Sequence, residues 1–156
     1  MPNDHYDLLN HLAPVDVERT LVLGSRISLS SGGELFPLGA AADSLYLISR
    51  GQISLTLPMK VRDRETDVVV EERTAGQTVG WSALIPPHRF TLRAVAPVET
   101  EVIALSRQAL EQLFTDHPDI AYTMSLNLAA VIGQRLQLFQ AMWLREVARM
   151  VEQRAA

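Results

Sequence analysis

The rhythm of apolar and polar side chains between residues 26 and 105 restricts this chain to few folds. Apolar and polar residues alternate there in short runs, which is the pattern of half-buried β-strands. Glycines or charged turns separate the runs. About eight short strands with turns between them predict a mainly β fold with flanking α, an eight-stranded barrel or jelly-roll. The clearest runs are 26–30, 44–49, 50–57, 68–73, 90–95 and 99–105, with a charged hairpin tip at 61–67.

Helical patterns lie on both sides of the β region. Leu8, Leu9 and Leu12 share one face of a short lead-in helix that Pro14 interrupts. After the last strand, Ser106 can cap a helix, because its hydroxyl can accept from a backbone amide in the first turn. We therefore expect one domain over 1–156, with an N-terminal helix at 5–23, a β-roll at 25–105 and C-terminal helices at 106–154.

The composition excludes several functions. The chain has no cysteine, which rules out disulfides, thiolate metal sites and a cysteine nucleophile. Its net charge of -4 does not favour a nucleic-acid-binding face. The four histidines lie at 5, 11, 88 and 117, without the close spacing of metal ligands, so no metal site is expected. No motif of a serine hydrolase or a phosphate-binding loop occurs, so we expect no enzyme.

The C-terminal pattern predicts one long helix over residues 119–153. At 1.5 Å per residue it would extend roughly 50 Å, beyond the width of a small β-roll. Its outer half carries Phe139, Trp143 and Val147 on one face, and that face needs a partner. We expect a homodimer through 119–153, in which the same helix of a second chain covers this face. The alternative is that the helix folds back on its own roll.

The glycine spacing resembles that of the cyclic-nucleotide-binding domain family. This family includes the sensor domains of catabolite-activator and fumarate–nitrate-type regulators, the regulatory subunits of protein kinase A, and the cytoplasmic domains of gated channels. The resemblance covers roughly residues 10 to 150 and implies an eight-stranded roll, of the jelly-roll or double-stranded β-helix type, plus a long C-terminal helix. The positions in register are Gly33, Gly39, Tyr46 and Gly51 within "GGELFPLGAAADSLYLISRGQISL", and Gly76 and Gly80 within "AGQTVGWSAL".

The resemblance places a ligand site at the turn after Gly80. In the family this glycine starts one turn of helix whose amide groups point into the roll, where they favour an anion. Ser82 and Ala83 would supply these amides here, and a basic residue of the next strand would complete a phosphate cradle. The implied ligand is a cyclic nucleotide or another small anion. The candidate ligand-binding residues are Gly80, Trp81, Ser82, Ala83, His88, Arg89 and Thr91.

Two departures from the family pattern affect this site. Nucleotide-binding members have a glutamate after the glycine, which accepts the ribose 2′-hydroxyl, whereas Trp81 has a donor and no acceptor. Counted back from Thr91, the position of the family's phosphate-binding arginine holds His88. A one-residue deletion in the loop would bring Arg89 inward instead, and strand alternation allows only one of the two to face the pocket. Trp81 either stacks on a planar ligand or fills the space of the sugar.

The family's C-terminal helix also covers the pocket. Our predicted register places Ala130, Gly133, Gln134 and Gln137 at its mouth. Gly133 would allow close approach of a ligand or of the partner helix. A ligand touching this helix would change how two helices cross, which would transmit a signal.

These features predict a cytoplasmic, standalone sensor or regulatory module with an altered pocket. The alternative is a dimerisation or interaction module whose vestigial pocket is plugged by Trp81, and the less favoured one is a true cyclic AMP receptor that uses Arg89. No stretch is apolar enough to span a membrane. The sequence ends at Ala156, where catabolite-activator proteins continue into a helix-turn-helix, so we expect no DNA binding by this chain alone and an unidentified effector protein as partner.

Overall fold

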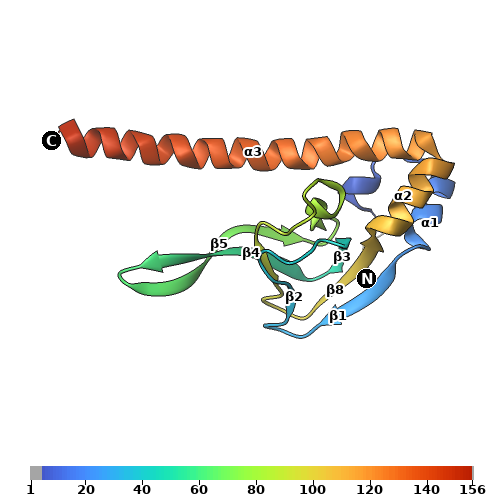
Figure 1. Ribbon diagram of the computed structural model, residues 1–156, viewed down its shortest axis with the longest axis horizontal. Coiled ribbons are helices and arrows are strands. Elements are labelled where there is room, and N and C mark those ends of the chain that lie inside the picture. Colours follow the sequence, from blue (N-terminus) through green and yellow to red (C-terminus); the bar gives the residue numbers. More distant parts are fainter. Residues whose placement is uncertain (1–4, 156) are drawn as a thin grey trace.

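The computed structural model describes residues 5–155. Residues 1–4 and 156, the two ends of the domain predicted over 1–156, lie outside the described residues. In the described part, two four-stranded antiparallel sheets form a roll, and a long helix runs across its top (Figure 1). The predicted eight-stranded fold is confirmed, although the two sheets do not close into a barrel. The strands are β1 (Ser25–Leu29), β2 (Glu34–Phe36), β3 (Ser44–Arg50), β4 (Gln52–Val61), β5 (Arg64–Thr74), β6 (Thr78–Val79), β7 (Arg93–Val95) and β8 (Thr100–Ser106).

The strand order is that of a jelly-roll. One sheet has the order β1-β8-β3-β6 and the other β2-β7-β4-β5, so the chain crosses repeatedly between the sheets. The first and last strands are therefore neighbours, with Ser25 opposite Ala104. The inner faces of both sheets form the core. Its fully covered side chains include Leu45 and Leu47 of β3 and Ile53 of β4.

The longest hairpin, β4–β5, projects from the roll beneath the long helix (Figure 1). Arg62 and Asp63 form its turn with positive φ angles of 51° and 62°, as a two-residue hairpin turn with the right twist requires. The predicted charged tip at 61–67 is thus shorter than expected, because β5 already starts at Arg64.

The N-terminal segment forms two helical pieces instead of the single predicted helix. A 3₁₀ turn, η1, covers Asp7–Leu9, and helix α1 covers Pro14–Leu21. Pro14 begins α1 and does not interrupt a helix, because a proline in the first turn removes an amide that has no helical partner there.

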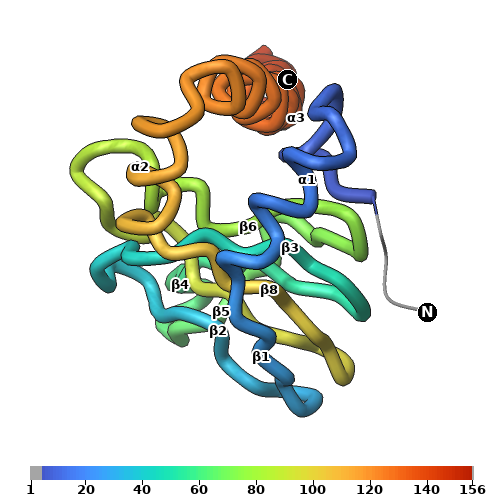
Figure 2. Tube along the Cα trace, turned by 90° about the vertical axis from the view of Figure 1, so that its right-hand side faces the viewer, coloured from blue at the N-terminus to red at the C-terminus, as the bar shows by residue number. Residues whose placement is uncertain are grey.

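Helix α2 (Arg107–Asp116) starts where predicted, since the Ser106 hydroxyl accepts from the Ala109 amide at 3.1 Å. Helix α3 (Pro118–Ala155) then runs for 38 residues, about 57 Å at 1.5 Å per residue. Its first half packs on the roll, with α2 on one side and the N-terminal helices on the other (Figure 2). Asn127 fixes this half by donating to the Leu8 and Asn10 carbonyls at 2.8 and 2.7 Å.

The second half of α3 extends past the body of the roll (Figure 1). Its large apolar side chains are exposed, including Trp143 at 64%, Leu144 at 66% and Val151 at 61%. The alternative that the whole helix folds back onto its own roll does not occur in this chain.

Candidate functional site

The turn at Gly80 has the shape that the sequence predicts. Gly80 has a left-handed backbone, with φ 78° and ψ 30°, and the one-turn 3₁₀ helix η2 (Trp81–Leu84) follows it. A side chain at this position would also be crowded, because its Cβ would lie 3.2 Å from both the Phe90 and Tyr46 rings. Glycine is therefore required by conformation and by space.

The amides of this turn are only partly available to a ligand. The Ala83 amide donates to the Gly80 carbonyl at 3.1 Å, so it closes the 3₁₀ turn itself. The Ser82 amide is then the remaining candidate of the two that we predicted. A four-residue helix also has a small dipole, which limits its attraction for an anion.

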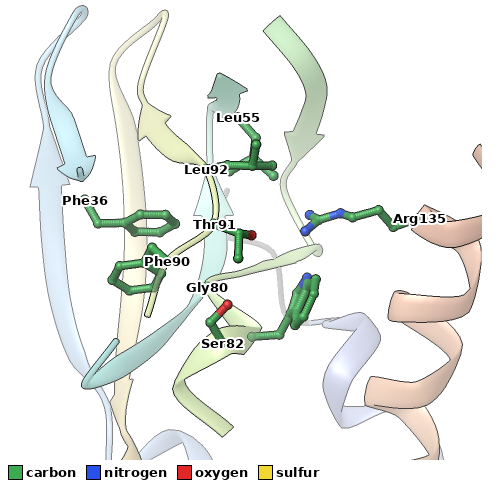
Figure 3. A pocket seen from close by; sticks show the side chains of 9 residues that line it. Phe36, Leu55, Gly80, Ser82, Phe90, Thr91, Leu92 and Arg135 are labelled. Atoms are coloured by element: carbon green, nitrogen blue, oxygen red, sulfur yellow. The ribbon is translucent and has the colours of Figure 1, made fainter. Parts of the chain in front are cut away.

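Behind the turn lies a very small cavity of about 20 Å³. On one side the Phe36 and Phe90 rings stack with their centroids 3.7 Å apart, and Leu55 and Leu92 complete the apolar wall (Figure 3). A space of this size admits about one water molecule. The space directly behind the turn is therefore filled by the protein's own side chains. It adjoins a wider groove of about 460 Å³ between the roll and α3, which Trp81, Thr91 and Arg135 also line.

The predicted ligand-binding residues separate into two groups. Gly80, Trp81, Ser82 and Thr91 line the cavity, and Ala83 is buried next to them. His88 and Arg89 are not among the lining residues.

Phe90, and neither of the two candidate basic residues, points into the cavity from this part of the chain. Arg89 is exposed and donates to the Gly39 carbonyl at 3.0 Å, while Phe90, the next residue, points inward. The His88 ring lies with Nδ1 3.3 Å from the Ser82 carbonyl oxygen, outside the cavity. Neither of the two open alternatives, His88 or Arg89, lies inside the roll.

The charge at this cavity comes instead from Arg135 of α3, which the sequence analysis missed. Its guanidinium lies over the Trp81 ring, 5.1 Å from the ring centroid, and its Nε donates to Glu71 at 2.6 Å. The Arg135 side chain is 10% exposed. Burial lowers the Arg135 pKa, and Arg73 lowers it further, whereas Glu71 opposes the shift. An arginine within an apolar helical stripe, between Ile132 and Phe139, was the signal that could have identified it.

Arg135 is one end of a chain of buried ion pairs. Glu71 of β5 also accepts from Arg73 Nη1 at 3.2 Å, and Arg73 Nη2 reaches Asp7 at 3.2 Å. Asp7 in turn accepts from the Thr78 hydroxyl at 2.5 Å. The side chains of Glu71 and Arg73 are 10% and 8% exposed. These contacts connect α3, β5, β6 and the N-terminal segment.

Glu71 is an acid close to Trp81, yet it does not replace the carboxylate that the family places after the glycine. Two arginines already occupy its oxygens, and Glu71 is not among the residues that line the cavity. The position of the missing glutamate is filled by the Trp81 ring.

The helix that covers the site has a different rotation from the one we predicted. Ala130, Gln134 and Gln137 are exposed, and Gly133, whose added Cβ would meet no described atom within 4 Å, lies beside them. The residues of α3 that face the roll here are Ile132, Arg135, Leu136 and Phe139. The rotation of a helix about its axis depends on side-chain packing, which the sequence pattern gives only to within a residue or two.

Within residues 5–155 no group of three or more metal-ligating side chains comes together. In the same residues, no helix combines the length and the hydropathy needed to cross a bilayer.

Comparison with known proteins agrees with this architecture. The family model described as "Cyclic nucleotide-binding domain" matches residues 26–117. The cyclic AMP receptor protein of Thermus thermophilus is 30% identical over 135 residues, which are 83% of this chain and 57% of that protein. The chain thus spans little more than half the length of this relative.

Solved structures show the same fold. The Thermus thermophilus catabolite activator protein gives a TM-score of 0.73 at 25% identity, over 91% of this chain and 63% of that one. A cyclic nucleotide-binding domain from Methylobacillus flagellatus gives 0.71 at 19% identity, over 96% and 82%. The sensor domain of the regulator DNR from Pseudomonas aeruginosa gives 0.64 at 19% identity, over 85% and 87%.

The glycine-started turn, the jelly-roll order, the covering helix and the match over more than half of the residues lead to one conclusion: this chain belongs to the cyclic nucleotide-binding domain family.

Proposed function

We propose that this protein is a regulatory domain whose own side chains fill the nucleotide cavity, and that it signals as a dimer through α3. It acts in the cytoplasm on an effector protein, has no enzymatic activity and does not bind DNA through these residues. Arg135 and Trp81 perform the contact between roll and helix that a ligand would otherwise make.

The observation that carries the proposal is the size of the cavity. Sites for small organic ligands have volumes of roughly 300–1,000 Å³, and the space behind Gly80 has about 20 Å³. The stacked Phe36 and Phe90 rings and the Trp81 ring surround this space and leave no room behind Gly80 for a larger group. The phosphate end of a nucleotide could reach the turn after Gly80 only if these rings moved, which would expose core side chains, although the adjoining groove between the roll and α3 has about 460 Å³.

The chemistry of the cavity also disfavours a nucleotide. The carboxylate for the ribose is replaced by Trp81, and the basic side chain expected for the phosphate, whether His88 or Arg89, lies outside. Each hydrogen bond to a charged group contributes about 1.5–3 kcal/mol, so the absence of both removes about 3–6 kcal/mol. This loss corresponds to roughly two to four decades in affinity.

The contacts of α3 support a signalling role that needs no nucleotide. Arg135 holds the helix to the roll through Glu71 and Trp81, and Asn127 holds it to the N-terminal segment. The exposed face around Trp143 and Val151 is a large apolar surface, which is typical of an interface. A second α3 covering this face would bury it and make the dimer.

A small-anion sensor is the second candidate. It is favoured by the Ser82 hydroxyl and the Arg135 guanidinium, which line the same small cavity. Only an ion of about the size of water fits there without movement of the rings, so chloride is the relevant probe and phosphate is not.

Calorimetric titration with cyclic AMP and cyclic GMP tests the proposal. We expect no binding at micromolar concentration of either nucleotide, and a double variant, Trp81→Glu with Phe90→Ala, should gain affinity for both. Native mass spectrometry should show a dimer. A wild-type dissociation constant in the micromolar range or below would refute the closed cavity, and a monomer at high concentration would refute the dimer. Chloride-dependent stability that is lost in Ser82→Ala would favour the anion sensor.

A further inference from the structure

A second groove, of about 360 Å³, lies between α2, α3 and the end of η2. It is separate from the groove that Trp81 and Arg135 line, since the two share only Ile132. It opens on the side of α3 where α2 lies (Figure 2). Because its walls are mostly apolar, it favours an occupant with an apolar face. The large apolar side chains of these walls are Leu84, Ile85, Phe114, Met124, Leu128 and Ile132.

The apolar surface continues beyond the groove. Tyr122 and Leu126 of α3 are 68% and 55% exposed, and they lie three residues before and one residue after Ser125, which lines the groove. Ile85 at the groove itself is 38% exposed. Exposed apolar surface of this extent is typical of a contact with another protein. A groove between two packed helices is also the shape into which a third, amphipathic helix can pack.

The charge around this groove has one sign. Glu111 of α2 lines the groove, and Asp116 and Asp119 lie at the corner where α2 leads into α3. The ion pairs of the described residues include none of these three carboxylates. No lysine or arginine occurs between residues 108 and 134. A partner with basic side chains beside its apolar face would therefore complement this surface.

A second copy of the chain does not supply this charge through the same half of α3. Residues 118–134 contain no lysine or arginine, and the whole chain has a net charge of -4. The dimer proposed above uses the distal half of α3, around Trp143 and Val151, and leaves this groove open. The charge therefore favours a different protein as the occupant.

We infer that the groove between α2 and α3 is the docking site for a basic amphipathic helix of the effector protein. Apolar side chains of that helix fill the groove, and its lysines or arginines meet Glu111 and the two aspartates at the corner. The inference deepens the proposed function, since it gives the chemistry of the effector on which the module acts. It does not depend on whether the cavity behind Gly80 is closed.

Three peptides test this chemistry. The probe is a helical peptide of about 16 residues, made of leucine and lysine, in which leucine recurs at i, i+3, i+4 and i+7. One twin has glutamate in place of each lysine, and the other has the composition of the probe in an order that forms no apolar face. Calorimetry on the full chain should show that the probe binds at least about tenfold more tightly than either twin.

The twins separate the two parts of the inference. Equal binding of the probe and the reordered twin would show attraction by charge alone. Equal or tighter binding of the glutamate twin would show that the acidic side chains do not matter. Either result, or no binding of the probe at about 100 μM, would overturn the inference.

Two variants with matched controls test the location. Ala129→Trp fills the groove and should weaken probe binding about tenfold, whereas Ala130→Trp, at an exposed neighbour that does not line the groove, should leave it unchanged. Glu111→Lys should weaken binding to a similar extent. Glu18→Lys makes the same change in net charge at an exposed position of α1, and should have little effect.

The results of these variants decide the inference. Circular dichroism checks that each variant is folded, and Glu111→Lys alters a surface side chain, so it decides the matter if Ala129→Trp does not fold. Equal effects of Glu111→Lys and Glu18→Lys would refute docking in the groove. Loss of the dimer in Ala129→Trp but not in Ala130→Trp, seen by native mass spectrometry, would assign the groove to a second copy and would refute it too. Cyclic nucleotides test the closed cavity separately, so the two failures give different results.

Discussion

Glu71 allows the sharpest test of how α3 is held on the roll, through the substitution Glu71→Gln. The carboxylate accepts from Arg135 at 2.6 Å and from Arg73 at 3.2 Å, and all three side chains are 10% exposed or less. Glutamine keeps the shape and removes the charge. Two neighbouring guanidinium groups then lie buried with no common counter-ion.

The magnitude follows from the burial. Removal of one partner from a buried ion pair typically costs about 3–5 kcal/mol, because the remaining charge stays out of water. We expect a loss of about 3 kcal/mol or more in the free energy of unfolding. For a domain of this size, this corresponds to a fall of roughly 6–12 °C in the midpoint of thermal unfolding.

The measurement is urea unfolding followed by circular dichroism at one fixed protein concentration, since dimer formation would make stability depend on concentration. Glu99→Gln is the matched control. Its ion pair with Arg50 spans 3.7 Å between side chains that are 80% and 58% exposed, so its loss should change stability by less than about 1 kcal/mol. If Glu71→Gln and Glu99→Gln had the same small effect, our account of the buried ion pairs would be wrong.

Three further predictions test other parts of the structure. Gly80→Ala should lower stability by about 1–2 kcal/mol in chemical unfolding, because it forces a left-handed backbone on a residue with a Cβ that crowds Phe90; an unchanged midpoint would contradict this. Hydrogen bonds, first from Ser49 and then from Arg26, keep the pKa of Glu101 below its ordinary value. The contribution of Glu101 to stability is therefore complete above about pH 4.3 and is lost as pH falls through the lower folded pKa. Glu101→Gln should flatten the pH dependence of the unfolding midpoint in this acidic range. A pH profile identical to that of the wild type would refute this prediction. Trp143→Glu should convert the dimer to a monomer in sedimentation experiments without changing the circular dichroism spectrum, and a persistent dimer would place the interface elsewhere.

The fold follows from local patterns that the sequence displays directly. Strand alternation, the turn at Gly80 and the cap at Ser106 each depend on neighbouring residues, and the structure confirms them. The start of α1 was misjudged because Pro14 has two opposite effects: it interrupts a helix interior and favours a helix start.

The candidate site was predicted only in part, because its contents depend on contacts between distant segments. A shift of one residue between Arg89 and Phe90 decides which side chain enters the roll, and loop length alone does not determine that shift. Arg135 and Glu71 are 64 residues apart. No local pattern indicates that they pair, and the same is true of the stacking of Arg135 on Trp81.

The central claim is that the turn at Gly80 encloses too little space for a nucleotide. The most direct measurement is an amide NMR titration of the protein with cyclic AMP at millimolar concentration, followed at residues 80–83 and at Arg135. We predict that none of these signals shifts in a saturable way. Saturable shifts at Ser82 and Ala83 with micromolar affinity would show that the rings of Phe90 and Trp81 give way to a ligand, and would contradict the account.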